Sequence, residues 1–496
     1  MTDALPSPRS AAGLVTASIA GVVGVAGSYA VAGSSASFVA VPVHGLVVDL
    51  TPAPVLAFAI VVLGDVGDVV GFGIALAVAA SALAVVAAAG LSLARRYGRA
   101  AGLGAVYLGG WGLAYLLTGR PWASLGAAVP TVAVVGLARS RLAAPPVELD
   151  RTRRRVLRAA GTLGFVGLAY LVGSREPIGT PPRLSSIPAS EQATIERRLA
   201  DARHRSLDVR GIDGLVSPVT GFYEVDVDAV NPDVGVADWS LAVTGAVAQD
   251  VEVSYDDLTA MAPAHHFSTL RCVGESLNGD KMDNALWTGV PAGHLLDRAG
   301  VGADATHVVL HAADGFYEEF PLDALRGGLL AYGMNGRLLP RSHGFPVRAL
   351  VPGHWGEVNV KWLTEVEVIA GERTGFWEVR GWHGTGPVNT VAKLHAVNRL
   401  RDGRIQVGGH AYAGTRGVRS VQVSTDGGET WSAASLSAPL PDADVWRQWA
   451  FEYEPPNGEH EVVVRAVDGE GATQPRDRSV AFPSGPTGWV SRRVSP

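Results

Sequence analysis

The first third of the chain is strongly apolar, and this limits its possible folds more than any other feature. Five segments rich in Ala, Val, Leu and Gly, uncharged apart from Arg158, occupy residues 12–33, 69–93, 100–119, 121–138 and 156–174. Each is near the ~20 residues that a helix needs to cross a bilayer core of about 30 Å. A helix satisfies its own backbone polar groups in lipid. Residues 1–174 are therefore expected to form an α-helical membrane bundle of about five transmembrane helices.

A sixth apolar run, residues 52–64, is too short to cross as a helix, because at about 1.5 Å per residue it spans only about 20 Å. Arginines follow the second predicted span and lie between the fourth and fifth, so both loops are predicted to be cytoplasmic. Five crossings then place residues 175–496 outside, whereas a sixth would move the N-terminus outside. We expect 52–64 to be an interfacial or re-entrant segment.

The entry to the fifth span, Thr152-Arg-Arg-Arg-Val-Leu-Arg, is similar to a twin-arginine export signal placed internally. Alternatively, these arginines only obey the positive-inside rule. No small-residue cleavage pattern follows Gly173-Ser-Arg, so the helix is expected to remain as an anchor. Residues 175–204 are predicted to be a linker rich in proline and small polar residues, with a short helix over 190–203.

The remaining chain is predicted to form two globular domains. Residues 205–383 mix strand-like runs, such as 239–245 and 306–311, with helical pieces at 290–299 and 321–325, which favours an α+β domain. Residues 384–496 consist of short alternating runs separated by Gly and Asp, with Asp426-Gly-Gly expected to form a tight hairpin turn. This pattern is typical of an all-β immunoglobulin-like sandwich.

Cys272 is the only cysteine, so no intrachain disulfide can form, and the sulfur either has a chemical role or fills space in the core. Its context is Thr269-Leu-Arg-Cys-Val-Gly-Glu-Ser. Other notable segments are, in order, Thr220-Gly-Phe-Tyr-Glu-Val-Asp, Leu330-Ala-Tyr-Gly-Met-Asn-Gly, His343-Gly-Phe-Pro-Val-Arg and Val351-Pro-Gly-His-Trp-Gly-Glu-Val-Asn-Val-Lys-Trp-Leu. Together they resemble the sulfite oxidase superfamily of molybdopterin-dependent oxidoreductases, over about residues 205–490.

The resemblance implies a molybdenum–molybdopterin cofactor, with Cys272 as the metal ligand; a thiolate is the soft ligand that such a centre requires. It also implies that the Tyr332 hydroxyl lies near the metal and donates a hydrogen bond to the transferred oxygen. Each of these aromatic and charged residues could instead be an ordinary core or surface residue. The implied cofactor-binding residues are Tyr223, Glu224, His343, Arg348, Gly356, Glu357, Val358 and Lys361.

The chain departs from sulfite oxidases where they hold the sulfite anion. Glu275 follows the cysteine in place of arginines, and Val358-Asn359 replaces an Arg-His pair. An anion would meet a less favourable field, so we expect a neutral S- or N-oxide substrate, with sulfite as the alternative. The Phe-Tyr-Glu run is closer to bacterial protein-methionine-sulfoxide reductases, so the oxide is expected to be small or protein-bound. A sensor that keeps the fold without turnover is a further alternative.

Electrons are expected to come from a separate redox carrier. The first 200 residues contain one histidine, His44, and one methionine, so the helices lack paired haem ligands and no haem is expected. They also carry almost no charge beyond Asp65 and Asp68, which argues against a transporter. The net charge of −6 argues against a nucleic-acid partner.

Two further expectations concern assembly and origin. The C-terminal domain resembles the family's dimerisation domain, so a homodimer is possible. Only three of the 41 basic residues are lysines, Lys281, Lys361 and Lys393, and the chain is rich in Ala, Val, Gly and Asp. This composition indicates a prokaryote with a GC-rich genome, a haloarchaeon being one candidate.

Overall fold

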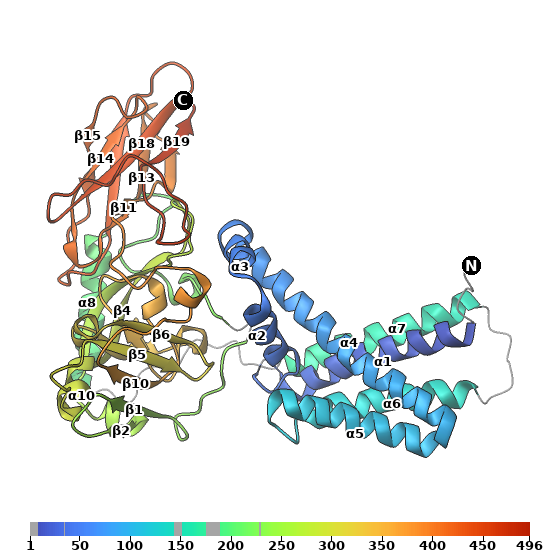
Figure 1. Cartoon of the computed structure of the whole chain (residues 1–496). Helices are drawn as coiled ribbons and strands as arrows, with labels where there is room; N and C mark the ends of the chain where they lie inside the picture. The colour runs from blue at the N-terminus through green and yellow to red at the C-terminus, as the bar shows by residue number, and fades with distance from the viewer. Residues whose placement is uncertain (1–7, 34, 143–150, 175–188, 228–229) are drawn as a thin grey trace. The chain divides into compact units, whose positions relative to one another are not determined.

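The computed structural model describes the chain except residues 1–7, 34, 143–150, 175–188 and 228–229. It divides into two compact units (Figure 1). The first contains Met1–Gly179 and Asp226–Asp233, and the second contains Thr180–Val225 and Val234–Pro496. Each unit is described by itself below.

The first unit is a bundle of helices. Figure 1 shows long helices packed along one another, with α1 beside α4, α6 and α7, and with α5 beside α4 and α6. The elements are α1 (Pro8–Ala32), α2 (Ala40–Leu50), α3 (Ala53–Phe58), a π-helical turn (Ala59–Leu63), α4 (Asp65–Tyr97), α5 (Arg99–Thr118), α6 (Ser124–Leu142) and α7 (Arg151–Gly173).

Glycines let these helices approach closely. A Cβ at Gly21 on α1 would lie 2.1 Å from the Ala80 carbonyl oxygen of α4, and one at Gly27 would lie 2.4 Å from the Gly126 oxygen of α6. Small residues at helix contacts are typical of membrane bundles. Large apolar side chains are meanwhile exposed, as at Leu116, which is 84% exposed. Both features support the predicted membrane bundle.

In the part of the chain that the structure describes, three helices are long and apolar enough to span a membrane: Ala12–Ala32, Val66–Tyr97 and Arg99–Thr118. A fourth candidate is the pair Ala40–Leu50 and Ala53–Leu63, which is bent by 112° and has the geometry of either a broken span or a re-entrant loop. Among the described residues, Ser124–Leu137 and Ala159–Gly173 are shorter apolar helices. The five-span count and the orientation therefore stay predictions.

Two sheets and three short helices make up the α+β part of the second unit, as the sequence predicts. One sheet has the order β2-β1-β10-β5-β6, and the other has the order β3-β4-β7-β8 with β9 paired to β7. The first contains β1 (Ser240–Gly245), β2 (Val251–Ser254), β5 (His307–Ala312), β6 (Tyr317–Pro321) and β10 (Leu363–Ile369). The second contains β3 (Ala264–Arg271), β4 (Met282–Pro291), β7 (Leu329–Met334), β8 (Arg337–Leu338) and β9 (Arg348–Leu350). The helices are α9 (Tyr255–Thr259), α10 (Ala292–Ala299) and α11 (Leu322–Arg326).

The C-terminal part is a β-sandwich. Its sheets have the orders β11-β13-β17-β16, with β12 paired to β13, and β15-β14-β18-β19. Side chains from both sheets, such as Val407, Trp449, Val421 and Val464, share one core. The strands are β11 (Val391–Ala392), β12 (Ala396–Arg399), β13 (Ile405–Tyr412), β14 (Val418–Ser424), β15 (Ser432–Ala433), β16 (Ser435–Leu436), β17 (Arg447–Tyr453), β18 (His460–Asp468) and β19 (Val490–Val494).

The Asp426 turn is longer than the tight hairpin that we expected. β14 and β15 pair as predicted, but residues 425–431 separate them. The Asp426 carboxylate accepts hydrogen bonds from the backbone N–H groups of Glu429 at 3.1 Å and Thr430 at 3.0 Å. The carboxylate thus accepts hydrogen bonds from backbone N–H groups that have no partner strand within the loop, and this stabilises a turn wider than a two-residue hairpin.

The described part of the predicted linker contains a docked helix, α8 (Ala189–Arg205). Arg198 Nη1 donates to the His265 carbonyl oxygen at 2.7 Å, and Glu191 Oε2 lies 2.9 Å from His265 Nε2. His265 belongs to β3, so α8 packs on the same unit as the cofactor-binding segments. The predicted helix is confirmed, and it is part of the globular unit.

Candidate functional site

Cys272 is the first residue after β3, where the chain turns into the loop that leads to β4. Its backbone N–H donates to the Lys281 carbonyl oxygen at 3.0 Å, which closes the base of that loop. The residue as a whole is partly exposed, although its sulfur has largely buried surroundings. Burial raises its pKa to about 11, although the Lys281 ammonium acts in the opposite direction. The thiol is therefore protonated near neutral pH until a metal displaces the proton.

Tyr223 follows the 3-10 turn η2 (Val219–Gly221). Its backbone N–H donates to Asp283 Oδ2 at 2.9 Å. A Cβ at Gly356 would lie 2.8 Å from the Tyr223 hydroxyl oxygen and 3.2 Å from the Arg271 carbonyl oxygen. Burial, followed by the charge of the Cys272 sulfur, raises the pKa of the Tyr223 phenol well above its usual value. The absence of a side chain at Gly356 thus brings Tyr223 close to the end of β3.

Two cations lie side by side near the 3-10 turn η3 (Arg341–His343). Gly344 has a φ of +103°, and a Cβ there would lie 3.0 Å from Lys361 Cβ and 3.1 Å from Arg348 Cβ. Arg348 Nη1 donates to the His343 carbonyl oxygen at 3.2 Å, and Lys361 Nζ donates to the Ser342 oxygen at 2.9 Å. Backbone carbonyls thus hold both cations next to His343.

His343 offers a buried polar atom to a ligand. Its side chain is 2% exposed, and its Nε2 has no hydrogen-bond partner among the described residues, with Glu224 Oε1 at 3.7 Å. Burial, followed by the charges of Arg348 and Lys361, lowers the pKa of the ring to about 3, so it is neutral. Buried polar atoms normally have partners. An unsatisfied ring nitrogen beside two cations fits a polar, anionic cofactor.

The remaining predicted cofactor-binding residues are Glu224, Glu357 and Val358. Glu224 is exposed and accepts a hydrogen bond from Ser342 Oγ at 2.6 Å. The 3-10 turn η4 (Gly356–Val358) places Val358 in the core, whereas Glu357 is half-buried with both carboxylate oxygens unpartnered among the described residues. Burial, followed by the charge of Glu378, raises the pKa of Glu357 to about 8.

Among the described residues, no group of three or more His, Cys, Asp or Glu side chains could hold a metal ion. A metal at Cys272 must therefore bring most of its own ligands, as a metal inside an organic cofactor does. The partly exposed thiol, the unsatisfied His343 nitrogen and the paired cations fit a cofactor that combines a soft metal with a phosphate.

Two family models match the chain. Residues 228–377 match the oxidoreductase molybdopterin binding domain, and residues 387–483 match the Mo-co oxidoreductase dimerisation domain. YuiH of Bacillus subtilis (strain 168), named an uncharacterized oxidoreductase, is 34% identical over 150 residues, which are 30% of this chain and 74% of that protein. The chain belongs to the sulfite oxidase superfamily of molybdopterin oxidoreductases.

Two further relatives match about half of the chain. Mitochondrial sulfite oxidase of Macaca fascicularis is 31% identical over 297 residues, which are 49% of this chain and 54% of that protein. Sulfite oxidase of Arabidopsis thaliana is 26% identical over 335 residues, which are 54% of this chain and 84% of that protein. The chain thus spans about half the length of the animal sulfite oxidase. In a solved structure, the sulfane dehydrogenase SoxCD of Paracoccus pantotrophus matches with a TM-score of 0.48 and 22% identity, covering 53% of this chain and 75% of that chain.

Tyr332 is not brought into this group by any described contact. It is the extra residue of a β-bulge, because Gly333 and Ala331 pair with the consecutive residues Thr288 and Gly289. Its ring lies edge-on to Tyr255, with 6.4 Å between centroids. Burial, followed by the charge of Glu191, raises its pKa to about 12. Its role beside the metal stays a prediction.

Glu275 is not the uncompensated charge that we expected from the sequence. Its side chain is 1% exposed, with Oε1 2.6 Å from Arg271 Nε and Oε2 2.6 Å from Lys393 Nζ. One carboxylate between two cations leaves a local charge of about +1, so it does not repel an anion as a lone carboxylate would. The expected repulsion of sulfite by Glu275 was therefore wrong.

Sequence reasoning missed Arg271 and Lys393 as members of the site region. Arg271 directly precedes Cys272, and Lys393 is one of only three lysines. The rarity of lysine was a signal that could have drawn attention to Lys393. Nothing in the sequence pairs residue 393 with residue 275, because that contact joins segments that are distant along the chain.

Proposed function

We propose that the chain is a membrane-anchored molybdopterin oxidoreductase that transfers an oxygen atom together with two electrons. The observation that carries this proposal is the Cys272 thiol, the only one in the chain, partly exposed at the end of β3 inside the segment that matches the molybdopterin-binding model. A non-catalytic binding protein would have no need for a soft, accessible metal ligand at this point.

The chain's residues would hold the cofactor and control protons. When bound, the molybdenum cofactor supplies the two-electron redox chemistry. The Cys272 thiolate would ligate the metal, and His343, Arg348 and Lys361 would hold the anionic part of the cofactor. The Tyr223 phenol keeps its proton, because burial raises its pKa, so its hydroxyl can donate a hydrogen bond at Gly356.

We propose a neutral S- or N-oxide as substrate, either small or carried on a protein methionine. Reduction of a sulfoxide takes up two electrons and two protons and yields a sulfide and water. The support for a neutral substrate is the apolar Val358, which is buried where sulfite oxidases carry an arginine.

Sulfite oxidation is the second candidate, because Glu275 is neutralised by Arg271 and Lys393. In that reaction sulfite and water give sulfate, two electrons and two protons. Relatives that carry the name sulfite oxidase also support it.

We further propose that the enzyme acts at the extracytoplasmic face and exchanges electrons with a separate redox carrier without haem of its own. The apolar helices of the first unit support a multi-pass position in the cell membrane. The match of residues 387–483 to a dimerisation domain supports a homodimer.

The test is metal analysis of the purified full chain and of Cys272→Ser, followed by turnover assays with sulfite, methionine sulfoxide, dimethyl sulfoxide and chlorate. We expect about one molybdenum per native chain and activity reduced by at least ~100-fold in Cys272→Ser, because a hydroxyl is a much harder ligand. Full turnover in Cys272→Ser would exclude the proposed ligand. A higher specificity constant for sulfite than for every neutral oxide would select the second candidate.

A further inference from the structure

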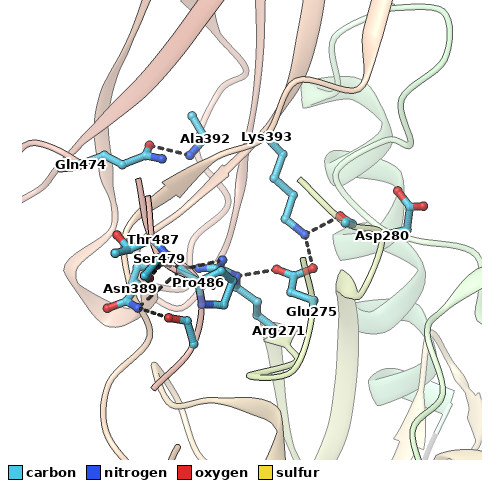
Figure 2. A network of polar contacts seen from close by, with 12 residues as sticks. Arg271, Glu275, Asp280, Asn389, Ala392, Lys393, Gln474, Ser479, Pro486 and Thr487 are labelled. Carbon is cyan, nitrogen blue, oxygen red and sulfur yellow. Dashed lines mark hydrogen bonds and ion pairs between the residues drawn. The ribbon is translucent and has the colours of Figure 1, made fainter. Parts of the chain in front are cut away.

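The loop that carries Cys272 is attached to the C-terminal sandwich by a buried ion triad. Figure 2 shows Glu275 between Arg271 and Lys393. Both contacts are 2.6 Å long, and the three side chains are 0%, 1% and 0% exposed, in the order Arg271, Glu275 and Lys393. Lys393 comes from the sandwich, next to β11, whereas the other two residues flank Cys272.

The far side of the loop is attached to the same place. Asn278 Nδ2 donates to the Leu394 carbonyl oxygen at 3.0 Å, and the Leu394 N–H donates to Asn278 Oδ1 at 2.8 Å. Lys393 Nζ also donates to the Gly279 carbonyl oxygen at 2.7 Å. Leu277 packs against the hydrophobic core of the sandwich. Four residues of the loop therefore have partners in the sandwich: Glu275, Leu277, Asn278 and Gly279.

Arg271 is fixed on its other side as well. Its Nη1 donates to the Asn389 carbonyl oxygen at 2.8 Å, and its guanidinium lies over the Trp355 ring at 4.7 Å from the centroid. Asn389 belongs to the segment that leads into the sandwich. The residue directly before Cys272 is thus held by the sandwich segment and by the η4 region together.

These contacts are specific in direction and costly to break. A buried carboxylate needs its cations, because removing one partner leaves an uncompensated charge in a low-dielectric interior. The Asn278–Leu394 pair fixes the loop through two parallel hydrogen bonds without any charge. A loop between two strands is otherwise held only at its ends, so its centre depends on what packs against it.

We propose that the Lys393–Leu394 segment of the sandwich is a positioning element for Cys272. It holds the loop 272–280 so that the thiol faces the cofactor, and it gives the C-terminal domain a role in the active site in addition to dimerisation. This inference rests on the proposed function, because it assumes that Cys272 is a metal ligand. The accessibility of Cys272 in the loop can nevertheless be measured without the cofactor.

The experiment measures alkylation of Cys272 by iodoacetamide in the cofactor-free full chain. Because Cys272 is the only cysteine, the label reports on one position. Native protein is compared with Lys393→Met and with Asn278→Ala, which releases the loop without leaving a buried charge. The control is Arg404→Met, which breaks the Arg404–Glu452 ion pair of the same sandwich, 2.7 Å long, at a site with no described side-chain contact to the loop or to residues 388–394.

We expect alkylation at least about tenfold faster in Lys393→Met and Asn278→Ala and unchanged in Arg404→Met, because local opening fully exposes a thiol that is only partly exposed in the native protein. Circular dichroism confirms that the variants are folded, and Asn278→Ala decides the outcome if Lys393→Met does not fold. Molybdenum content of the loaded protein should fall in the same two variants. Alkylation at the native rate in Asn278→Ala, or equal acceleration in Arg404→Met, would overturn the inference. The alkylation rate and the molybdenum content are both measured without turnover. Failure of the proposed function, which the Cys272→Ser turnover assay tests, can therefore be distinguished from failure of this inference.

Discussion

At the residue scale, Glu357 is a carboxyl group whose surroundings favour the protonated form. Its two oxygens are buried without partners among the described residues, and the backbone of Gly384 lies against Oε1, where a Cβ would be 2.0 Å away. Glu378 adds a second negative charge. Glu318 is close to Glu378, and burial raises the pKa of Glu318 to about 11. Glu357 and Glu318 therefore favour the protonated form in the folded chain.

We expect Glu357→Gln to stabilise the protein at high pH. The pKa of Glu357 is about 8 when folded and 4.5 in the reference state, so the folded state binds more protons between these values. Stability is then fully present below about pH 4.5 and lost as pH rises through about 8. At pH 9 the variant should unfold at a higher temperature than native protein, with a gain in stability on the order of a few kcal/mol. At pH 4.5 the two proteins should unfold at the same temperature. Glu459→Gln, at an exposed position, is the control. Parallel pH profiles for native protein and Glu357→Gln would contradict the assignment.

Glu275 belongs to the same scale, and its effect depends on its two cations. In Glu275→Arg a third cation would lie between Arg271 and Lys393, so we expect loss of about 3–5 kcal/mol of stability and of cofactor content. Asp280→Asn changes an exposed carboxylate of the same loop and should have little effect. Thermal unfolding and molybdenum analysis measure both. A stable Glu275→Arg protein with gained sulfite turnover would show that this side chain faces the substrate after all.

At the scale of elements, sequence patterns predicted those whose signal is local. The helices α10 and α11 and the strands β1 and β5 lie where periodicity indicated them. Helix α2 was missed because Pro42 and Gly45 are poor helix formers and interrupt its apolar pattern. Tyr223, His343, Arg348 and Lys361 were predicted from short segments that resemble the superfamily, and their cofactor roles stay predictions. Glu275 was misread, because the direction of its side chain depends on Lys393, which is distant along the chain. The role of Tyr332 stays a prediction, because the direction of its side chain depends on a β-bulge that the sequence does not indicate.

At the scale of the whole molecule, the apolar helices of the first unit raise the question of which side of a membrane would carry Cys272. The arginines Arg95, Arg96 and Arg99 border the junction of α4 and α5 at Gly98, and the positive-inside rule places this junction in the cytoplasm. Two crossings by α5 and α6, followed by one by α7, would bring the chain to the opposite side at Ser174. We therefore expect a reporter that is active only outside the cytoplasm to work when fused after Ser174 and to fail when fused after Gly98. A matching pair in which Arg153 and Arg154 become lysines tests export, because lysines keep the charge but not the twin-arginine signal. Loss of reporter activity after Ser174 in that variant would indicate the twin-arginine route, and retained activity would leave the positive-inside rule as the explanation of these arginines. Activity after Gly98 with none after Ser174 would place the catalytic unit in the cytoplasm, where its electron carrier would also have to be.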